Sequence, residues 1–131
     1  MSSLNKKKIL IVDDEPDVVA YIKILLEDQD LDTIVASNGA DGYKLVLSDK
    51  PDLITLDITM PIESGVMMYR DLRENEATAS IPVIIVTGID ENFKHFIKSR
   101  KNLVPPDGYF EKPIDKGEFI SRVNELLMTA S

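Results

Sequence analysis

The sequence contains no cysteine, a single histidine and no long apolar run. Without cysteine the chain has no disulfide framework and no thiolate chemistry. No apolar run is long enough to span a bilayer. The basic run Lys6–Lys8 is followed by only four apolar residues before Asp13, which is too few for a secretory signal. These absences predict a soluble, cytoplasmic protein that does not associate with a membrane.

Basic residues are also in the minority, with 15 Lys and Arg against 23 Asp and Glu and a formal net charge of -8. This excess of negative charge argues against general binding to nucleic acid or anionic lipid. The 131 residues and 44% hydrophobic content are enough for one core. We expect one domain over residues 1–131, with its core at about 7–128 and no effector domain after it. The sequence shows no internal repeat.

Short β-branched runs alternate with longer segments whose apolar residues recur at helical spacing. This alternation is typical of βαβ units. Three of the runs are almost continuously hydrophobic, as expected for parallel strands covered on both faces. The expected strands are 9–12, 33–36, 53–56, 83–86 and a weaker one around 109–110.

Between and after these runs, apolar residues line one face of three of the expected helices. The last helix has a clear start, because Asp115 can cap it while Glu118, three residues later, can reach back. Five strands and five helices in alternation predict an α/β fold, a doubly wound parallel sheet with helices on both faces. Ligands of such folds bind at the carboxyl ends of the strands. The apolar faces are Val18, Ile22 and Leu25; Phe93, Phe96 and Ile97; and Phe119, Val123, Leu126 and Leu127.

Acidic residues follow two of the expected strands. Asp13 and Asp14 come directly after the first strand and Asp57 directly after the third, so three carboxylates should converge. Two like charges about 4 Å apart repel by roughly 4 kcal/mol at an effective dielectric constant near 20. A bound hard cation relieves this repulsion, and an all-oxygen ligand set favours Mg2+ over Zn2+. The alternative is that Asp13 or Asp14 only caps the first helix ahead of Pro16.

Two further residues at strand ends suit an anion. Thr87 with Gly88 ends the fourth strand, and Lys112 with Pro113 ends the fifth. The lysine offers a positive charge, the threonine offers a hydroxyl donor, and glycine lets the backbone approach closely. Taken singly, Lys112 could be a solvated surface residue and Thr87 an ordinary strand residue. Together with the acids they predict a phosphate site.

Four motifs in this order resemble the receiver domain of two-component response regulators. The resemblance covers nearly the whole chain. It implies a flavodoxin-like sheet with strand order 2-1-3-4-5, in a signalling domain that is not an enzyme, although it catalyses its own phosphorylation and slow autodephosphorylation. The motifs are Ile9-Leu10-Ile11-Val12-Asp13-Asp14-Glu15; Asp57-Ile58-Thr59-Met60-Pro61 with Ser64-Gly65; Val86-Thr87-Gly88; and Gly108-Tyr109-Phe110-Glu111-Lys112-Pro113.

The resemblance also implies a role for each acidic residue. Asp57 would be the phosphoacceptor, taking a phosphoryl group from a phosphohistidine of a sensor histidine kinase or phosphotransfer protein. Asp14, Asp57 and the backbone carbonyl of Thr59 would bind Mg2+ directly, and Asp13 would bind it through water. Lys112 would pair with a phosphoryl oxygen, in a reaction dominated by positioning and charge stabilisation.

The same resemblance implies which residues carry the conformational switch and which set the lifetime of the acyl phosphate. Thr87 would bind the attached phosphoryl group, and Tyr109 would move inward with it. This pair would signal through the face of the fourth helix, fifth strand and fifth helix to an unknown downstream protein. The peptide bond before Pro113 would be cis. Thr59 and Asp90 would tune the lifetime of the acyl phosphate.

The segment between Thr87 and Lys112 departs from the family pattern. It is slightly long, and Pro105-Pro106 replaces the small residues that commonly precede the fifth strand. Lys94, Lys98 and Lys101 lie on one side of the expected fourth helix. They form either a solvated helix face or a docking stripe for an acidic partner. The sequence leaves open whether phosphorylation makes the chain a homodimer.

Three other functions compete with this interpretation. A phosphatase of the haloacid dehalogenase type needs a second Asp two residues after the nucleophile, where this chain has Thr59, a poor general acid near neutral pH. A flavodoxin needs a hydroxyl- and glycine-rich phosphate loop where this chain has Asp13 and Asp14. A non-phosphorylated interaction module of the same fold is disfavoured because all the expected site residues are present.

Overall fold

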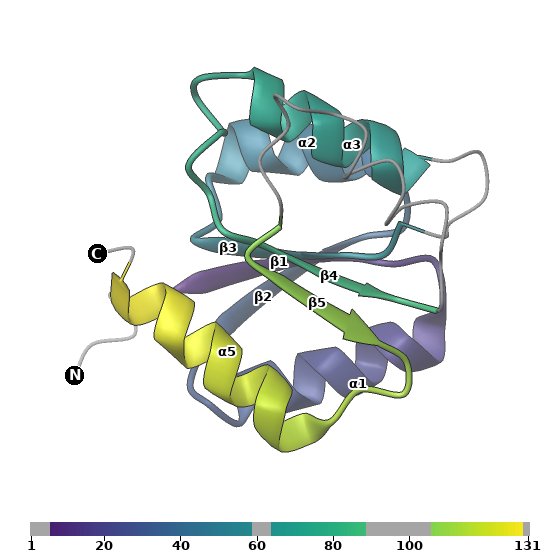
Figure 1. Ribbon diagram of the computed structural model, residues 1–131, viewed down its shortest axis with the longest axis vertical. Coiled ribbons are helices and arrows are strands. Elements are labelled where there is room, and N and C mark those ends of the chain that lie inside the picture. Colours follow the sequence, from purple (N-terminus) through teal and green to yellow (C-terminus); the bar gives the residue numbers. More distant parts are fainter. Residues whose placement is uncertain (1–5, 59–63, 89–105, 130–131) are drawn as a thin grey trace.

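The computed structural model describes residues 6–58, 64–88 and 106–129. Within them, strands and helices alternate along most of the chain (Figure 1). Every expected strand is present, with bounds within one residue of those expected from the sequence. The elements are β1 (Lys8–Val12), α1 (Pro16–Glu27), β2 (Asp32–Ala36), α2 (Gly39–Asp49), β3 (Leu53–Leu56), α3 (Ser64–Glu74), β4 (Val83–Thr87), β5 (Gly108–Glu111) and α5 (Lys116–Thr129).

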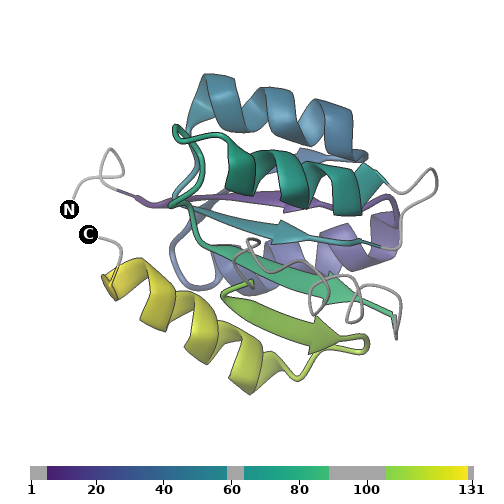
Figure 2. The same cartoon turned by 45° about the horizontal axis from the view of Figure 1, so that its top comes forward.

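The five strands form one parallel sheet in the order β2-β1-β3-β4-β5. Helices α2 and α3 cover one face of the sheet and α1 and α5 cover the other, so the domain has three layers (Figures 1 and 2). The predicted doubly wound fold and its strand order are confirmed. Because β1 and β3 are neighbours and the strand order reverses beside them, their carboxyl ends border the crevice where such folds bind ligands.

Burial explains why some strands are obvious in the sequence and others are not. Every residue of β3 and β4 is buried, as are four of the five in β1, because helices cover both faces of these central strands. The edge strands β2 and β5 are largely half-buried or exposed. Two hydrophobic clusters result, one between the sheet and α2 and α3, the other between the sheet and α1 and α5.

Helix starts follow local capping chemistry. Helix α1 begins at Pro16, whose fixed backbone angle suits a first helical position. The side chain of Asn38 accepts the N–H of Asp41 at 2.8 Å and caps α2. At α5, Asp115 accepts the N–H of Glu118 at 2.9 Å, which is the cap expected from the sequence. None of the described helices is both long and apolar enough to cross a bilayer.

Several sequence predictions fall outside the described residues. These are the helix expected between β4 and β5 and the possible docking stripe Lys94, Lys98 and Lys101. Thr59 and Asp90 also lie outside the described ranges. The roles expected for these residues therefore stay predictions.

At the amino-terminal ends of β4 and β5, on the side of the sheet away from the crevice, a nearly buried arginine links α3 to these two strands. The side chain of Arg73 is 5% exposed and donates to the carbonyl oxygens of Ala79 and Ile81, both at 3.0 Å. It also pairs with Asp107 at 3.0 Å, and the same Asp107 oxygen accepts the N–H of Val83 at 2.9 Å. This arginine therefore satisfies three oxygens at the start of β4 and β5.

We expect Arg73→Ala to lower the free energy of unfolding by about 3 kcal/mol, because it leaves Asp107 without its cation and two carbonyls without a donor. The matched control is Arg70→Ala on the same helix, whose pair with Asp71 at 3.2 Å is between a third and a half exposed. That change should cost less than about 1 kcal/mol. Urea denaturation measures both, and equal losses would contradict the structural role of Arg73.

Candidate functional site

Three carboxylates meet at the carboxyl ends of β1 and β3. Asp13, Asp14 and Asp57 each offer one oxygen, and these oxygens lie within 4.8 Å of one another. Asp13 and Asp57 are buried, whereas Asp14 is exposed to solvent. The sequence predicted this convergence, because parallel neighbouring strands end at the same edge of a sheet. The acidic group thus has two buried members and one that faces water.

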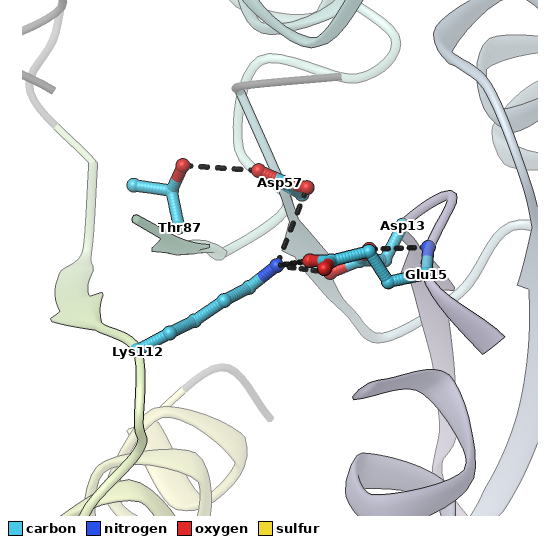
Figure 3. A network of polar contacts seen from close by, with 5 residues as sticks. All are labelled: Asp13, Glu15, Asp57, Thr87 and Lys112. Atoms are coloured by element: carbon cyan, nitrogen blue, oxygen red, sulfur yellow. Dashed lines mark hydrogen bonds and ion pairs between the residues drawn. The ribbon is translucent and has the colours of Figure 1, made fainter. Parts of the chain in front are cut away.

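Lys112 reaches this acidic group from the end of β5. Its Nζ lies 3.1 Å from Asp13 Oδ2 and 3.4 Å from Asp57 Oδ2, and it also contacts Glu15 Oε1 (Figure 3). The lysine side chain is 18% exposed, so this is not a solvated surface residue. The Lys112–Pro113 peptide bond that follows is cis.

Thr87 lies on the other side of Asp57, at the end of β4. Its hydroxyl donates to Asp57 Oδ1 at 2.9 Å, and both side chains are buried (Figure 3). The other carboxylate oxygen of Asp57 faces Lys112. The carboxylate is therefore oriented by a hydroxyl from β4 and an ammonium group from the loop after β5.

The alternative that Asp13 or Asp14 caps α1 is wrong. The capping residue is Glu15, and its side chain makes no capping hydrogen bond. Asp13 Oδ1 instead accepts the backbone N–H of Glu15 at 2.9 Å, which closes a turn just before the helix and leaves Oδ2 facing Lys112. The backbone of its own loop thus holds the Asp13 carboxylate in an orientation in which Oδ2 points into the crevice.

Burial and neighbouring charges perturb the ionisation of this group. Burial raises the pKa of Asp13, and the nearby carboxylate of Asp57 adds to the effect, against the lowering by the Glu15 N–H and by Lys112. For Lys112, burial lowers the pKa, but the carboxylates of Glu15, Asp13 and Asp57 outweigh it and hold the pKa above its ordinary value. The lysine therefore remains charged at neutral pH.

The donor set fits a hard divalent cation. All three carboxylates supply oxygen ligands, and the chain has no cysteine. Asp13 Oδ2 is buried, and among the described residues its partner is the Lys112 ammonium group at 3.1 Å, so this oxygen already lies where positive charge is accommodated. Oxygen ligands arranged in this way suit Mg2+ better than Zn2+.

The expected switch residues lie on one face of the sheet. Tyr109 pairs with Ile85 across β4 and β5, and Thr87 lies two residues beyond Ile85, so both side chains leave the same side. Tyr109 is half-buried and packs against the hydrophobic cluster under α2 and α3. Tyr109 and Thr87 therefore occupy neighbouring strands of the same face.

A glycine lets α3 pack closely against the loop after β3. A Cβ built on Gly65 would lie 2.2 Å from the backbone oxygen of Asp57 and 2.6 Å from Ile58 Cα, closer than any real contact. A Cβ on Gly88 would meet no described atom within 4 Å, so the expected close approach of an anion there stays a prediction. Among the contacts of described residues, close approach requires glycine at position 65.

Glu15 is a residue of the site whose role could not be predicted from the sequence. Its carboxylate makes the closest of the three contacts to Lys112, from a position 97 residues earlier in the chain. The only signal was its place directly after Asp13 and Asp14 in a charged run. That run does not reveal a contact with a residue at the end of β5, because the contact forms only when the sheet is assembled.

An acidic crevice with a hydroxyl and an ammonium group, at the carboxyl edge of a doubly wound sheet, defines a class of domain suited to a divalent cation and a phosphoryl group. Residues 9–124 match the protein family described as the response regulator receiver domain. The chain belongs to this family of two-component signalling domains.

Individual relatives agree with this assignment. Protein PilH of Pseudomonas aeruginosa is 34% identical over 120 residues, which cover 92% of this chain and 97% of PilH. The alkaline phosphatase synthesis transcriptional regulatory protein PhoP of Bacillus subtilis is also 34% identical, over 92% of this chain but only 48% of PhoP. The receiver domain of the Francisella response regulator 1452 superposes with a TM-score of 0.80 at 30% identity, covering 96% of this chain and 100% of that one.

We expect Gly65→Ala to lower the free energy of unfolding by about 1–3 kcal/mol, since a side chain there collides with the backbone of Asp57. The matched control is Gly117→Ala, also at the second residue of a helix, where the nearest atom is Asp115 Oδ1 at 3.6 Å. Higher helix propensity should make that change neutral or stabilising. Denaturant titration compares the two, and a stabilised Gly65→Ala variant would contradict the close approach.

Proposed function

We propose that Asp57 accepts a phosphoryl group from the phosphohistidine of a sensor histidine kinase or a phosphotransfer protein, with Mg2+ held by Asp13, Asp14 and Asp57. The observation that carries this proposal is the convergence of three carboxylates with Thr87 and Lys112 at one edge of the sheet. Membership of the receiver family supports it. By analogy with the family, the reaction takes place in the cytoplasm.

In this reaction a carboxylate oxygen of Asp57 attacks the phosphorus atom of the donor. A P–O bond forms, the P–N bond breaks, and the imidazole nitrogen leaves with the electron pair. The bound Mg2+ would neutralise charge on the phosphoryl oxygens. Lys112 supplies a second positive charge, and positioning of the acceptor provides most of the remaining catalysis. Attack by water on the acyl phosphate later releases inorganic phosphate and restores the carboxylate.

Residues around Asp57 would bind the attached phosphoryl group, complete the metal site and control hydrolysis. Thr87 exchanges its hydrogen bond with Asp57 for one with the attached phosphoryl group. The backbone carbonyl of Thr59 adds a metal ligand, and the side chains of Thr59 and Asp90 set the rate of hydrolysis. These last assignments follow the family pattern.

Phosphorylation adds roughly two negative charges beside Thr87 and Lys112. We propose that Thr87 and Tyr109 move together and change the face of the fourth helix, β5 and α5 that a downstream protein binds. Shifting a two-state element from 1:99 to 99:1 requires about 5.5 kcal/mol of differential interaction. One hydrogen bond contributes less than this, so several contacts must change together.

The surface beside the acceptor suits a protein as phosphodonor. A largely apolar cavity of about 490 Å³ opens next to Lys112, between the start of α1 and the loop before α5. Exposed apolar surface rimmed by charged residues is typical of sites where another protein docks. The apolar lining of the cavity consists of Val18, Tyr21, Pro113 and Ile114.

We expect the wild-type protein to gain the mass of one phosphoryl group on incubation with Mg2+ and phosphoramidate or acetyl phosphate. Asp57→Asn should gain none, because an uncharged amide is a far weaker nucleophile than a carboxylate. Asp28→Asn at the end of α1 serves as the control and should be labelled as the wild type is. Intact-protein mass spectrometry gives the readout. A wild-type protein that is never labelled would exclude the phosphoacceptor function.

Mg2+ alone should raise the free energy of unfolding of the wild type by about 1–3 kcal/mol at concentrations ten to a hundred times its dissociation constant. Asp14→Asn should lose most of this gain, because it removes one carboxylate of the acidic group. Asp28→Asn carries the same charge change away from the crevice and should keep the gain. Thermal or urea unfolding with and without a chelator measures it. An equal gain in both variants would argue against the site.

A further inference from the structure

Lys112 already has a full set of partners before any phosphoryl group arrives. Its ammonium group has three N–H donors, and it contacts three carboxylates, those of Glu15, Asp13 and Asp57. Figure 3 shows the three carboxylates around the end of the lysine side chain. A phosphoryl oxygen on Asp57 would be a fourth acceptor. Lys112 can bind it well only if one present partner gives up its place.

Glu15 is the partner that can leave at the lowest cost. Asp13 and Asp57 are buried, and each is held by a second hydrogen bond, from the Glu15 N–H and from the Thr87 hydroxyl respectively. The side chain of Glu15 is 58% exposed, so water can solvate its carboxylate once it lets go. The closest contact of Lys112 is therefore also its most replaceable one.

We propose that Glu15 is a positioning residue that holds Lys112 over the crevice in the unphosphorylated protein and is displaced by a phosphoryl oxygen when Asp57 is modified. Glu15 thereby sets how readily the site takes up a phosphoryl group. This inference rests on the proposed function of Asp57. Glu15, in the loop after β1, would thus control the position of Lys112, in the loop after β5.

The direction of the effect follows from competition for the ammonium group. Neutralising Glu15 leaves Lys112 with two charged partners and a donor free for the phosphoryl oxygen. An exposed ion pair is weak, so the change is modest, roughly two- to fivefold. Glu15→Gln should therefore be phosphorylated roughly two- to fivefold faster than the wild type, and should bind beryllofluoride, a stable mimic of the phosphoryl group, tighter by a similar factor.

The matched control is Asp17→Asn. Asp17 is also an exposed acid at the start of α1, and the described contacts include no ion pair between it and Lys112. Both variants remove one negative charge from nearly the same place. We would measure the rate constant for labelling by phosphoramidate and the dissociation constant for beryllofluoride, both at saturating Mg2+. Only Glu15→Gln should differ from the wild type.

A second comparison tests whether the effect passes through the lysine. In a Lys112→Gln background, Glu15→Gln should produce no gain in beryllofluoride affinity, because the competition no longer exists. A gain that persists there would show that Glu15 acts through the general field of the crevice. This coupling between two positions is not expected from a residue that only supports the fold.

The possible outcomes separate the two proposals. A wild type that takes up neither phosphoryl group nor beryllofluoride overturns the function of Asp57. If the wild type is labelled and Glu15→Gln matches it, or Asp17→Asn shows the same gain, the role of Glu15 is wrong while the function of Asp57 stands. Unfolding curves of Glu15→Gln and Asp17→Asn establish that both are folded before the rates are compared.

Discussion

The site depends on one constraint, that two carboxylates are buried side by side at the end of a sheet. Asp13 and Asp57 would repel each other strongly in an environment with little water. The ammonium group of Lys112 offsets this repulsion, because it contacts both carboxylates and that of Glu15. Because these residues follow β1, β3 and β5, the same ionic cluster also links the end of β5 to the ends of β1 and β3, neither of which is adjacent to β5 in the sheet. Stability and chemistry at this edge therefore rest on the same charges.

Much of the fold could be predicted because its signals are local. The central strands at 53–56 and 83–86 are unbroken apolar runs, a direct result of burial on both faces. The spacing between Asp115 and Glu118 predicted the start of α5, and the structure has the capping hydrogen bond there. The strand at 109–110 was the weakest prediction, because β5 is an edge strand whose residues are half-buried or exposed and need not be uniformly apolar.

The site was predictable where topology alone brings residues together. Asp13, Asp57, Thr87 and Lys112 each lie at the carboxyl end of a strand or directly after it, so the strand order was enough to place them at one edge. Side-chain geometry was not predictable in this way. The contact between Glu15 and Lys112 could not be predicted from the sequence. The hydrogen bond from the Glu15 N–H to Asp13 closes a turn before the helix and does not cap it.

The close fit of Gly65 against Asp57 determines which parts of the site can move. The first turn of α3 lies so near the acceptor backbone that there is no space for a methyl group. The acceptor backbone cannot slide toward α3, and it is also tied to β1 by the hydrogen bond from Asp57 N to Val12 O at 2.9 Å. Under the proposed function, a phosphoryl group on Asp57 would meet a main chain with little room to move, and the side chains around it would have to adjust. The backbone at Asp57 is thus constrained from two sides, by α3 and by β1.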